Sequence, residues 1–482
     1  MEEIVNTDQI KKKTVISTLS LFFQSGYSAF LGLVANLVLT ILVSPKIFGI
    51  YIALLSLISI LNYFSDIGLA ASLIQKKKIS NDDVKTTFTT QQLLILTAIG
   101  IAFSFSPFMK RFYNLPIEGI YLYWAWLFAF FLSSLKTIPS IFLERQIKFQ
   151  KIVLVQIVES TVFYLTVIFL AIMNFGLMSF TYGVILRAIA GLITIYSISY
   201  WKPQIGISWK SLKRLLSFGV PFQANSFLAL FKDDLIILYL GKVLGFEGLG
   251  YIGWAKKWAE APIRIIMDNI SRVLFPVLSN LQDDKEKVGR IIEKIFYYQT
   301  MLLAPATVGL ALIMRTLVEI IPKYGKWMPA LPLFYLFCFS AFLASYSTPF
   351  INLFNAFGRV KLTFSFMFFW TIATWFFTPI LTGLFGYYGF PITQVILSFS
   401  FIIVLINAKK LLEFRFLQSV YRSLISSVIM GMVVFILVEI TARSYFNISL
   451  SILIGILSYY LSYKNLYNVD LIGEIKSLFN YD

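Results

Sequence analysis

The segment SPKIFGIYIALLSLISILNYFSDIGLAASLIQ (residues 44–75) contains one long apolar run, residues 47–73, with a single charged side chain, Asp66. An α-helix needs about 20 apolar residues to cross the hydrocarbon core of a bilayer. The run is therefore predicted to span a membrane. Asp66 falls near one end of the run, where an acid can lie in the interface with water or take part in gating.

The segment GFEGLGYIGWAKKWAEAPIRIIMDNISRVLFPVLS (residues 245–279) has the same outline. In each segment a short loop leads into a Gly-aromatic helix start, and an acid follows about two-thirds of the way along, Asp66 or Asp268. Residues 133–149 and 344–362 form a second similar pair, again six predicted spans apart. This spacing favours two six-helix lobes in parallel repeat, an arrangement that commonly has a transport site between the repeats. Chance similarity between apolar helices is the alternative.

The whole chain has the composition of a membrane protein. Of its 482 residues, 58% are hydrophobic and 13% are charged, and the mean hydropathy is +0.79. Soluble domains contain about 25% charged residues. We predict an all-α polytopic membrane protein with about fourteen transmembrane helices, in two six-helix lobes with a C-terminal helix pair. The predicted spans are 17–43, 47–73, 87–108, 119–142, 152–173, 178–200, 215–240, 250–279, 291–314, 331–356, 362–385, 388–408, 417–442 and 447–463.

The distribution of basic residues predicts the orientation and the domain limits. Most Lys and Arg residues outside the predicted spans lie on the side of the N-terminus, so both termini are expected in the cytoplasm and the protein in the cytoplasmic (inner) membrane. The run QKKKISNDDVK (residues 75–85) is expected to be a solvated loop on that side. The predicted parts are a cytoplasmic N-terminus (1–16), an N-lobe of helices one to six (17–200), a cytoplasmic linker (201–214), a C-lobe of helices seven to twelve (215–408), helices thirteen and fourteen (417–463) and a cytoplasmic tail (464–482).

The residue types present exclude several classes of function. The chain has no histidine and one cysteine, Cys338, so a disulfide framework is excluded and a zinc enzyme or a Ser-His-Asp enzyme is disfavoured. We find no metal-ligand spacing and no phosphate-binding glycine loop, and we expect neither a cofactor nor enzyme activity. The net charge of +17 lies in the loops, because acidic and basic residues within the spans balance. We therefore predict no nucleic-acid binding.

The predicted spans nevertheless contain unusual charges. Lys232, Asp233 and Asp234 stand together in LALFKDDLIILYLG (residues 228–241), although each charge costs roughly 2.5–3.5 kcal/mol at a bilayer centre. Matching depths across a short hairpin predict that Asp233 or Asp234 pairs with Lys256 or Lys257.

A charged stripe follows on the next span. Its members are four residues apart and alternate in sign, so neighbours share a helix face and can form ion pairs; they are Lys256, Glu260, Arg264, Asp268 and Arg272. Three interpretations stay open: a helix on the membrane surface, structural pairing between helices, and a stripe that lines a water-filled cavity. Arg187, near the middle of span 178–200, is a further cavity candidate.

Three segments resemble the oligosaccharide (Wzx-type) flippases, and within them the colanic acid and teichuronic acid exporter branch of the multidrug/oligosaccharidyl-lipid/polysaccharide exporter superfamily. The segments are residues 48–88, 143–152 and 240–288, and the likeness covers roughly residues 15 to 420. The matching positions that are most specific are Gly248, Gly250, Tyr251, Arg272 and Pro276. The resemblance implies fourteen helices in two lobes around a central cavity, and translocation of an undecaprenyl-pyrophosphate-linked glycan between leaflets.

The expected function is therefore a flippase for a lipid-linked oligosaccharide in surface polysaccharide biosynthesis, working by alternating access. Expected partners are this glycan lipid, membrane lipid and the polysaccharide polymerase machinery. The alternative is a cation-coupled multidrug or metabolite antiporter of the same superfamily. The predicted anion contacts are Arg264, Arg187, Lys257, Arg272 and Lys256, and the predicted gating or coupling residues are Lys232, Asp233, Asp234, Glu260, Asp268 and Asp66.

Overall fold

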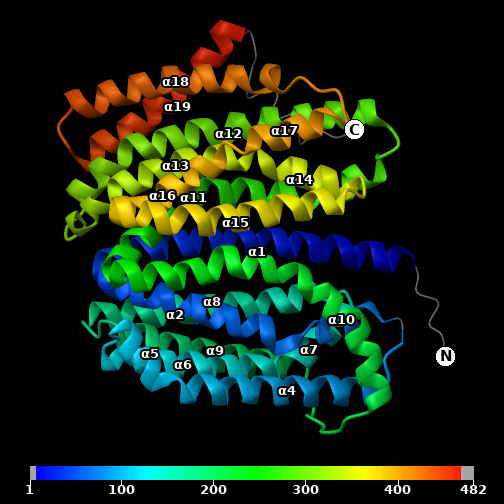
Figure 1. Cartoon of the computed structure of the whole chain (residues 1–482). Coiled ribbons are helices and arrows are strands. Elements are labelled where there is room, and N and C mark those ends of the chain that lie inside the picture. The colour runs from blue at the N-terminus through cyan, green and yellow to red at the C-terminus, as the bar shows by residue number, and fades with distance from the viewer. Residues whose placement is uncertain (1–6, 77, 468–482) are drawn as a thin grey trace. The chain divides into compact units, whose positions relative to one another are not determined.

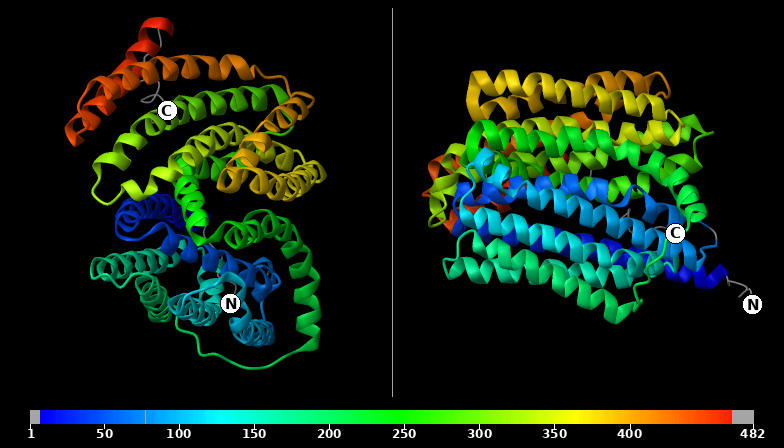
Figure 2. Two further views of the ribbon diagram at one scale, coloured as in Figure 1. Left: turned by 60° about the vertical axis from the view of Figure 1, so that its left-hand side comes forward. Right: turned by 60° about the horizontal axis from the view of Figure 1, so that its bottom comes forward.

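The computed structural model describes residues 7–76 and 78–467, and every regular element among them is a helix (Figure 1, Figure 2). The elements are α1 (Thr7–Leu42), α2 (Pro45–Asp66), α3 (Leu69–Gln75), α4 (Asn81–Ser104), α5 (Ser106–Tyr113), α6 (Ile117–Leu135), α7 (Thr137–Arg145), α8 (Phe149–Ile172), α9 (Met178–Ile198), α10 (Trp209–Leu230), η1 (Phe231–Leu235), α11 (Ile236–Asn280), α12 (Lys285–Ile320), η2 (Gly325–Ala330), α13 (Leu331–Ser345), α14 (Ser347–Ala356), α15 (Val360–Phe385), η3 (Gly386–Tyr388), α16 (Gly389–Ser398), α17 (Phe401–Lys409), α18 (Phe416–Ile440) and α19 (Tyr445–Tyr467).

Local sequence signals determine where α2 begins and ends. The Ser44 hydroxyl accepts a hydrogen bond from the Ile47 amide, and Pro45 occupies the first turn, where its missing N–H is not needed. Ile67 and Gly68 both have left-handed backbone angles, with φ of 46° and 75°. The predicted span 47–73 is therefore two helices, α2 and α3, joined by a sharp bend.

The chain forms two compact units, Met1–Gly250 and Tyr251–Asp482. In the first unit α1 packs on α8, α8 on α9, and α9 on α6, which also contacts α2 and α4. In the second unit α18 packs between α12 and α19, and α16 packs on α13 and α15. The predicted lobe limits, 17–200 and 215–408, stay a prediction.

The described residues include 12 stretches that are long and apolar enough to cross a membrane. The two longest stretches, both well beyond the length that one crossing needs, are Phe231–Met267, with 37 residues, and Val360–Lys409, with 50. A non-helical residue, Gly245 (φ 70°, ψ 174°), interrupts the first stretch, and η3 interrupts the second. The second stretch thus contains two of the predicted spans. The membrane fold is confirmed, while the count of fourteen stays a prediction.

The predicted span 215–240 has a more complex form in the structure. Helix α10 covers its first part and is steeply inclined to α4 and α6, near the end of this unit where α4 begins (Figure 1, Figure 2). The first turns of α10 carry Lys210, Lys213 and Arg214, which disfavours their insertion into hydrocarbon. The π-helical η1 follows, and such bulges commonly accompany a change in helix direction.

Two glycines allow α2 and the helix around residue 250 to approach closely. A Cβ atom on Gly250 would lie 2.0 Å from the Pro45 carbonyl oxygen, and one on Gly49 would lie 1.8 Å from the Phe246 carbonyl oxygen. Gly49 and Gly250 belong to the two Gly-aromatic helix starts that the sequence repeat aligns with each other. Their physical role here is close backbone packing.

Gly250→Ala is expected to lower the free energy of unfolding by about 1–3 kcal/mol, because the added methyl group overpacks the crossing. The thermal midpoint of the detergent-solubilised protein measures this change. Gly100→Ala is the matched control, because a Cβ there meets no heavy atom of the described structure within 4 Å. Equal midpoints for the two variants would contradict the packing role.

Candidate functional site

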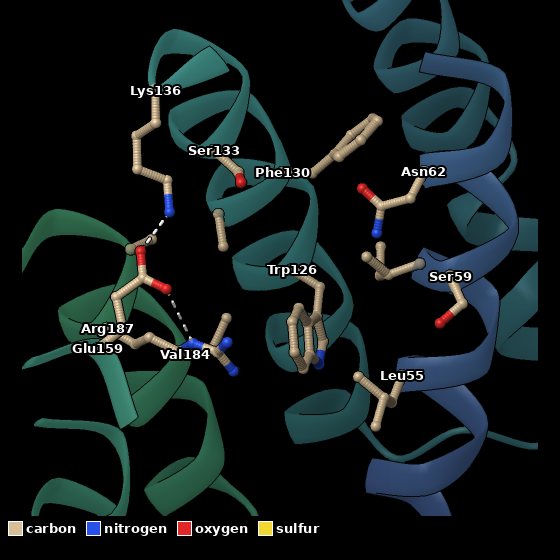
Figure 3. Close-up of a pocket in the computed structure, with 13 residues that line it drawn as sticks. Leu55, Ser59, Asn62, Trp126, Phe130, Ser133, Lys136, Glu159, Val184 and Arg187 are labelled. Carbon is tan, nitrogen blue, oxygen red and sulfur yellow. Dashed lines mark hydrogen bonds and ion pairs between the residues drawn. The ribbon is translucent and has the colours of Figure 1, made fainter. Parts of the chain in front are cut away.

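A cavity of about 240 Å³ lies within the first unit, among α2, α6, α8 and α9 (Figure 3). Its wall combines polar and aromatic side chains with three charged ones. It is lined by Leu55, Ile58, Ser59, Asn62, Trp126, Ala129, Phe130, Ser133, Lys136, Glu159, Val184, Arg187 and Ala188. The charged lining residues are Lys136, Glu159 and Arg187, so the cavity has a net charge of +1.

Glu159, on α8, is the centre of this charged group. Its carboxylate is buried, with 8% of the residue exposed, and accepts a hydrogen bond from Lys136 Nζ. Arg187 Nε lies 3.9 Å from the other carboxylate oxygen. A Cβ on Gly191 of α9 would lie 1.9 Å from Glu159 Oε1, so this glycine leaves the space that the carboxylate occupies.

The neighbouring cations offset the free-energy cost of burying the Glu159 carboxylate inside the helix bundle. An unpaired buried charge costs several kcal/mol, and two cations stabilise this one: Lys136, directly after α6, and Arg187, on α9. The side chain of Arg187 is 41% exposed, and its guanidinium lies over Phe163 at 5.9 Å from the ring centroid. In Figure 3 the guanidinium points toward Trp126 across the cavity. Arg187 can therefore bind an anion with the donors that do not face Glu159.

Arg187 thus lies in a cavity, and its contact with substrate stays a proposal. Lys136 and Glu159 were absent from the predicted site. The signal that could have found them is a pair of intramembrane charges of opposite sign on neighbouring predicted spans. The sequence could not predict that the two side chains pair. They lie 23 positions apart, on different predicted spans, and the pairing depends on which helix faces meet.

The predicted stripe on α11 begins with the expected ion pairs in the second unit. Glu260 lies 3.8 Å from Lys256 Nζ and 3.0 Å from an Arg264 guanidinium nitrogen. Lys256 also lies 5.9 Å from the Phe390 ring centroid, and the Arg264 side chain is 66% exposed. The pairing at i,i+4 is confirmed for this half of the stripe, whereas a role in substrate contact stays a prediction.

Several predicted residues have less structural support. Lys232 Nζ lies 3.3 Å from Asp233 Oδ1 within η1. The predicted pairing of Asp233 or Asp234 with Lys256 or Lys257 joins the two units and stays a prediction. The side chains of Asp66, Asp268 and Arg272 lie outside the described residues.

A comparison of the sequence with known families identifies the protein's relatives. Residues 38–332 match the family described as polysaccharide biosynthesis protein. The chain belongs to this family. A relative from Escherichia coli (strain K12), the lipopolysaccharide biosynthesis protein WzxC, is 26% identical over 348 residues, which cover 70% of this chain and 68% of that one. The resemblance that the sequence motifs carry is therefore confirmed.

Two solved structures of membrane transporters have the same fold as this chain. The lipid II flippase MurJ, in an inward closed conformation, matches with a TM-score of 0.76 at 15% identity, covering 95% of this chain and 100% of that one. A multidrug resistance MATE family transporter of the MOP superfamily, in an inward-facing conformation, matches with a TM-score of 0.59 at 15% identity, covering 81% and 95%. At this identity the likeness shows the fold, and it confirms the predicted all-helical membrane architecture.

Proposed function

We propose that this polysaccharide biosynthesis protein is a flippase for an undecaprenyl-pyrophosphate-linked oligosaccharide. Membership of the family is the observation that carries this function. The names of the relatives support it, since they include a lipopolysaccharide biosynthesis protein and a lipid II flippase. The protein would act in the cytoplasmic membrane, with both termini in the cytoplasm, and would supply a polysaccharide polymerase on the other side.

The charges of the cavity suit an anionic substrate. Lys136 and Arg187 outnumber Glu159, so a pyrophosphate or an acidic sugar gains charge-assisted hydrogen bonds on entering. Glu159 keeps both cations in place before the substrate arrives and limits the net charge to +1. A strongly cationic cavity would hold a pyrophosphate too tightly for release, whereas a nearly balanced one allows both steps.

The mechanism that we propose is alternating access. The pyrophosphate would bind at the charged wall of the cavity with the glycan extending from it, while the polyprenyl tail stays in lipid between helices. Ion pairs along α11, such as Arg264 with Glu260, would exchange partners as the protein changes conformation. The cation-coupled antiporter is the alternative, and export of cationic dyes on an imposed ion gradient would favour it.

Deletion of the gene in its native host tests the proposed function. Surface polysaccharide is expected to disappear and the lipid-linked oligosaccharide to accumulate in the membrane, and the intact gene is expected to restore both. Normal surface polysaccharide in the deletion strain would contradict the proposal.

Arg264→Ala is expected to reduce export at least tenfold while the protein still inserts, because it removes a predicted anion contact and the ion-pair partner of Glu260. Surface polysaccharide measured at equal protein levels gives the effect. Arg290→Ala is the matched control, since Arg290 is as exposed as Arg264 and forms a similar i,i+4 pair, but its partner Glu286 is 81% exposed whereas Glu260 is 24% exposed. Normal export by the Arg264 variant would exclude its proposed role.

A further inference from the structure

The segment between α9 and α10 has an unusual surface at the end of the first unit. Its backbone is fixed to α4: the Gly206 amide donates to Thr89 Oγ1 and the Ser208 amide donates to Thr86 Oγ1, both at 2.9 Å. These bonds hold a stretch without helical structure along the bundle. The side chains of this segment are thus presented in a defined position.

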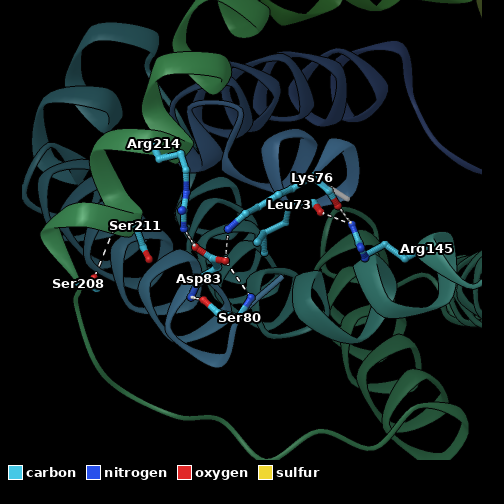
Figure 4. Close-up of polar contacts among 8 residues, drawn as sticks. All are labelled: Leu73, Lys76, Ser80, Asp83, Arg145, Ser208, Ser211 and Arg214. Carbon is cyan, nitrogen blue, oxygen red and sulfur yellow. Dashed lines mark hydrogen bonds and ion pairs between the residues drawn. The ribbon is translucent and has the colours of Figure 1, made fainter. Parts of the chain in front are cut away.

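The first turns of α10 continue this surface. Ser211 and Leu215 are buried against the unit, and an Arg214 guanidinium nitrogen donates to Asp83 Oδ1 at 2.7 Å (Figure 4). These contacts fix which side of α10 faces inward. Trp209, Lys210, Lys213 and Ser217 lie on the opposite side and are exposed.

The exposed side of residues 200–213 combines large apolar side chains with lysines. Tyr200 is 78% exposed, Ile205 84% and Trp209 80%. Lysines alternate with them along the chain and are also exposed; they are Lys202, Lys210 and Lys213. Acidic side chains are absent from this segment of the sequence, so its charge is uniformly positive.

A lipid surface satisfies both properties of this segment better than water does. Tryptophan and tyrosine favour the headgroup level of a bilayer, and lysines beside them attract anionic lipids by about 1 kcal/mol each. The position agrees, because α9 ends and α10 begins at the predicted cytoplasmic end of the helices. The steep inclination of α10 to α4 and α6 is also typical of a helix that lies in the interface (Figure 1).

We propose that residues 200–213 form a docking surface for anionic phospholipid headgroups. Ile205 and Trp209 enter the interface, and Lys202, Lys210 and Lys213 contact lipid phosphates. Anionic lipid would thereby stabilise the inclined position of α10, which leads directly into the charged segment η1. This surface is separate from the cavity and does not depend on which molecule the protein transports.

A fluorophore on a single cysteine tests the proposal in the full-length protein. The only native cysteine, Cys338, is buried, so Cys338→Ser with Gln204→Cys gives one exposed labelling position. The labelled protein is placed in nanodiscs of phosphatidylcholine with increasing phosphatidylglycerol. The emission is expected to shift to shorter wavelength as the anionic fraction rises. Cys338→Ser with Gln282→Cys, in the exposed loop after α11, is the matched control and should show no such shift.

Two sets of variants separate the contribution of the lysine charges from that of the apolar side chains that enter the interface. Lys213→Gln is expected to raise the phosphatidylglycerol fraction at which half of the emission shift has occurred, by about fivefold. This change corresponds to ~1 kcal/mol per basic residue near an anionic surface. Neutralising all three lysines should abolish the shift. Ile205→Ser with Trp209→Ser should weaken it although the lysines remain. Two results would overturn the proposal: emission that does not change with the phosphatidylglycerol fraction, or a shift in the three-lysine variant as large as that of the protein with its lysines.

Discussion

Glu159→Gln is expected to abolish export and to lower the free energy of unfolding by about 3–5 kcal/mol, the usual effect of removing one partner from a buried ion pair. Glutamine keeps the shape of the side chain against Gly191. It leaves the Lys136 ammonium, with a side chain only 16% exposed, without its carboxylate. Thermal unfolding in detergent and surface polysaccharide in cells measure the two effects.

Lys136→Met combined with Glu159→Gln separates these effects. The double variant should recover much of the stability, because the unpaired ammonium is gone, and the difference from the single variants gives the coupling energy. Export should stay low, since the proposed anion site has lost a cation and the group that orients Arg187. A Glu159→Gln protein as stable as the wild type would show that the ion pair contributes little.

Asp83→Ala is expected to cost about 3 kcal/mol of stability, because one fully buried side chain supports several contacts (Figure 4). Asp83 accepts hydrogen bonds from Lys76 Nζ, from an Arg214 guanidinium nitrogen and from the Ser80 amide. The last belongs to the capping box that starts α4, whose loss alone costs about 0.5–2 kcal/mol. Thermal unfolding of the purified protein gives the size of the effect.

Two further variants separate the contributions to the stability that Asp83→Ala loses. Asp83→Asn retains an acceptor for the Ser80 amide and loses only the ionic contacts, so its loss should be the smaller one. Asp82→Ala changes the neighbouring acid, which is exposed, and should cost about 0.3–1 kcal/mol through the helix dipole. A similar loss for Asp82→Ala and Asp83→Ala would contradict the role of the buried site.

The sequence predicted the membrane fold well, because long apolar runs are a strong signal. Helices α8 and α9 fall almost at the predicted spans 152–173 and 178–200. Inclined or broken helices were harder, since mean hydropathy does not report direction. The span 215–240 therefore became α10, η1 and the beginning of α11.

The candidate site was predicted only in part, for a physical reason. Ion pairs within one helix follow from spacing, and the pairs of Glu260 with Lys256 and Arg264 were found this way. Pairs between helices depend on which faces meet, as for Glu159 and Lys136. The burial of Asp83 could not be predicted for the same reason, because its contact with Arg214 joins two helices. Its charged neighbours predicted a solvated loop, and that prediction is wrong for Asp83, which is 0% exposed.

Transport by the purified protein tests the central claim most directly. The protein is reconstituted in vesicles with a fluorescent polyprenyl-pyrophosphate oligosaccharide, and the fraction of label reached by a membrane-impermeant quencher is followed with time. The wild-type protein should move the label between leaflets, Arg187→Ala should slow this at least tenfold, and Arg187→Lys should retain part of it. Label movement no faster than in protein-free vesicles, in a preparation that exports a cationic dye, would contradict the flippase and support the antiporter.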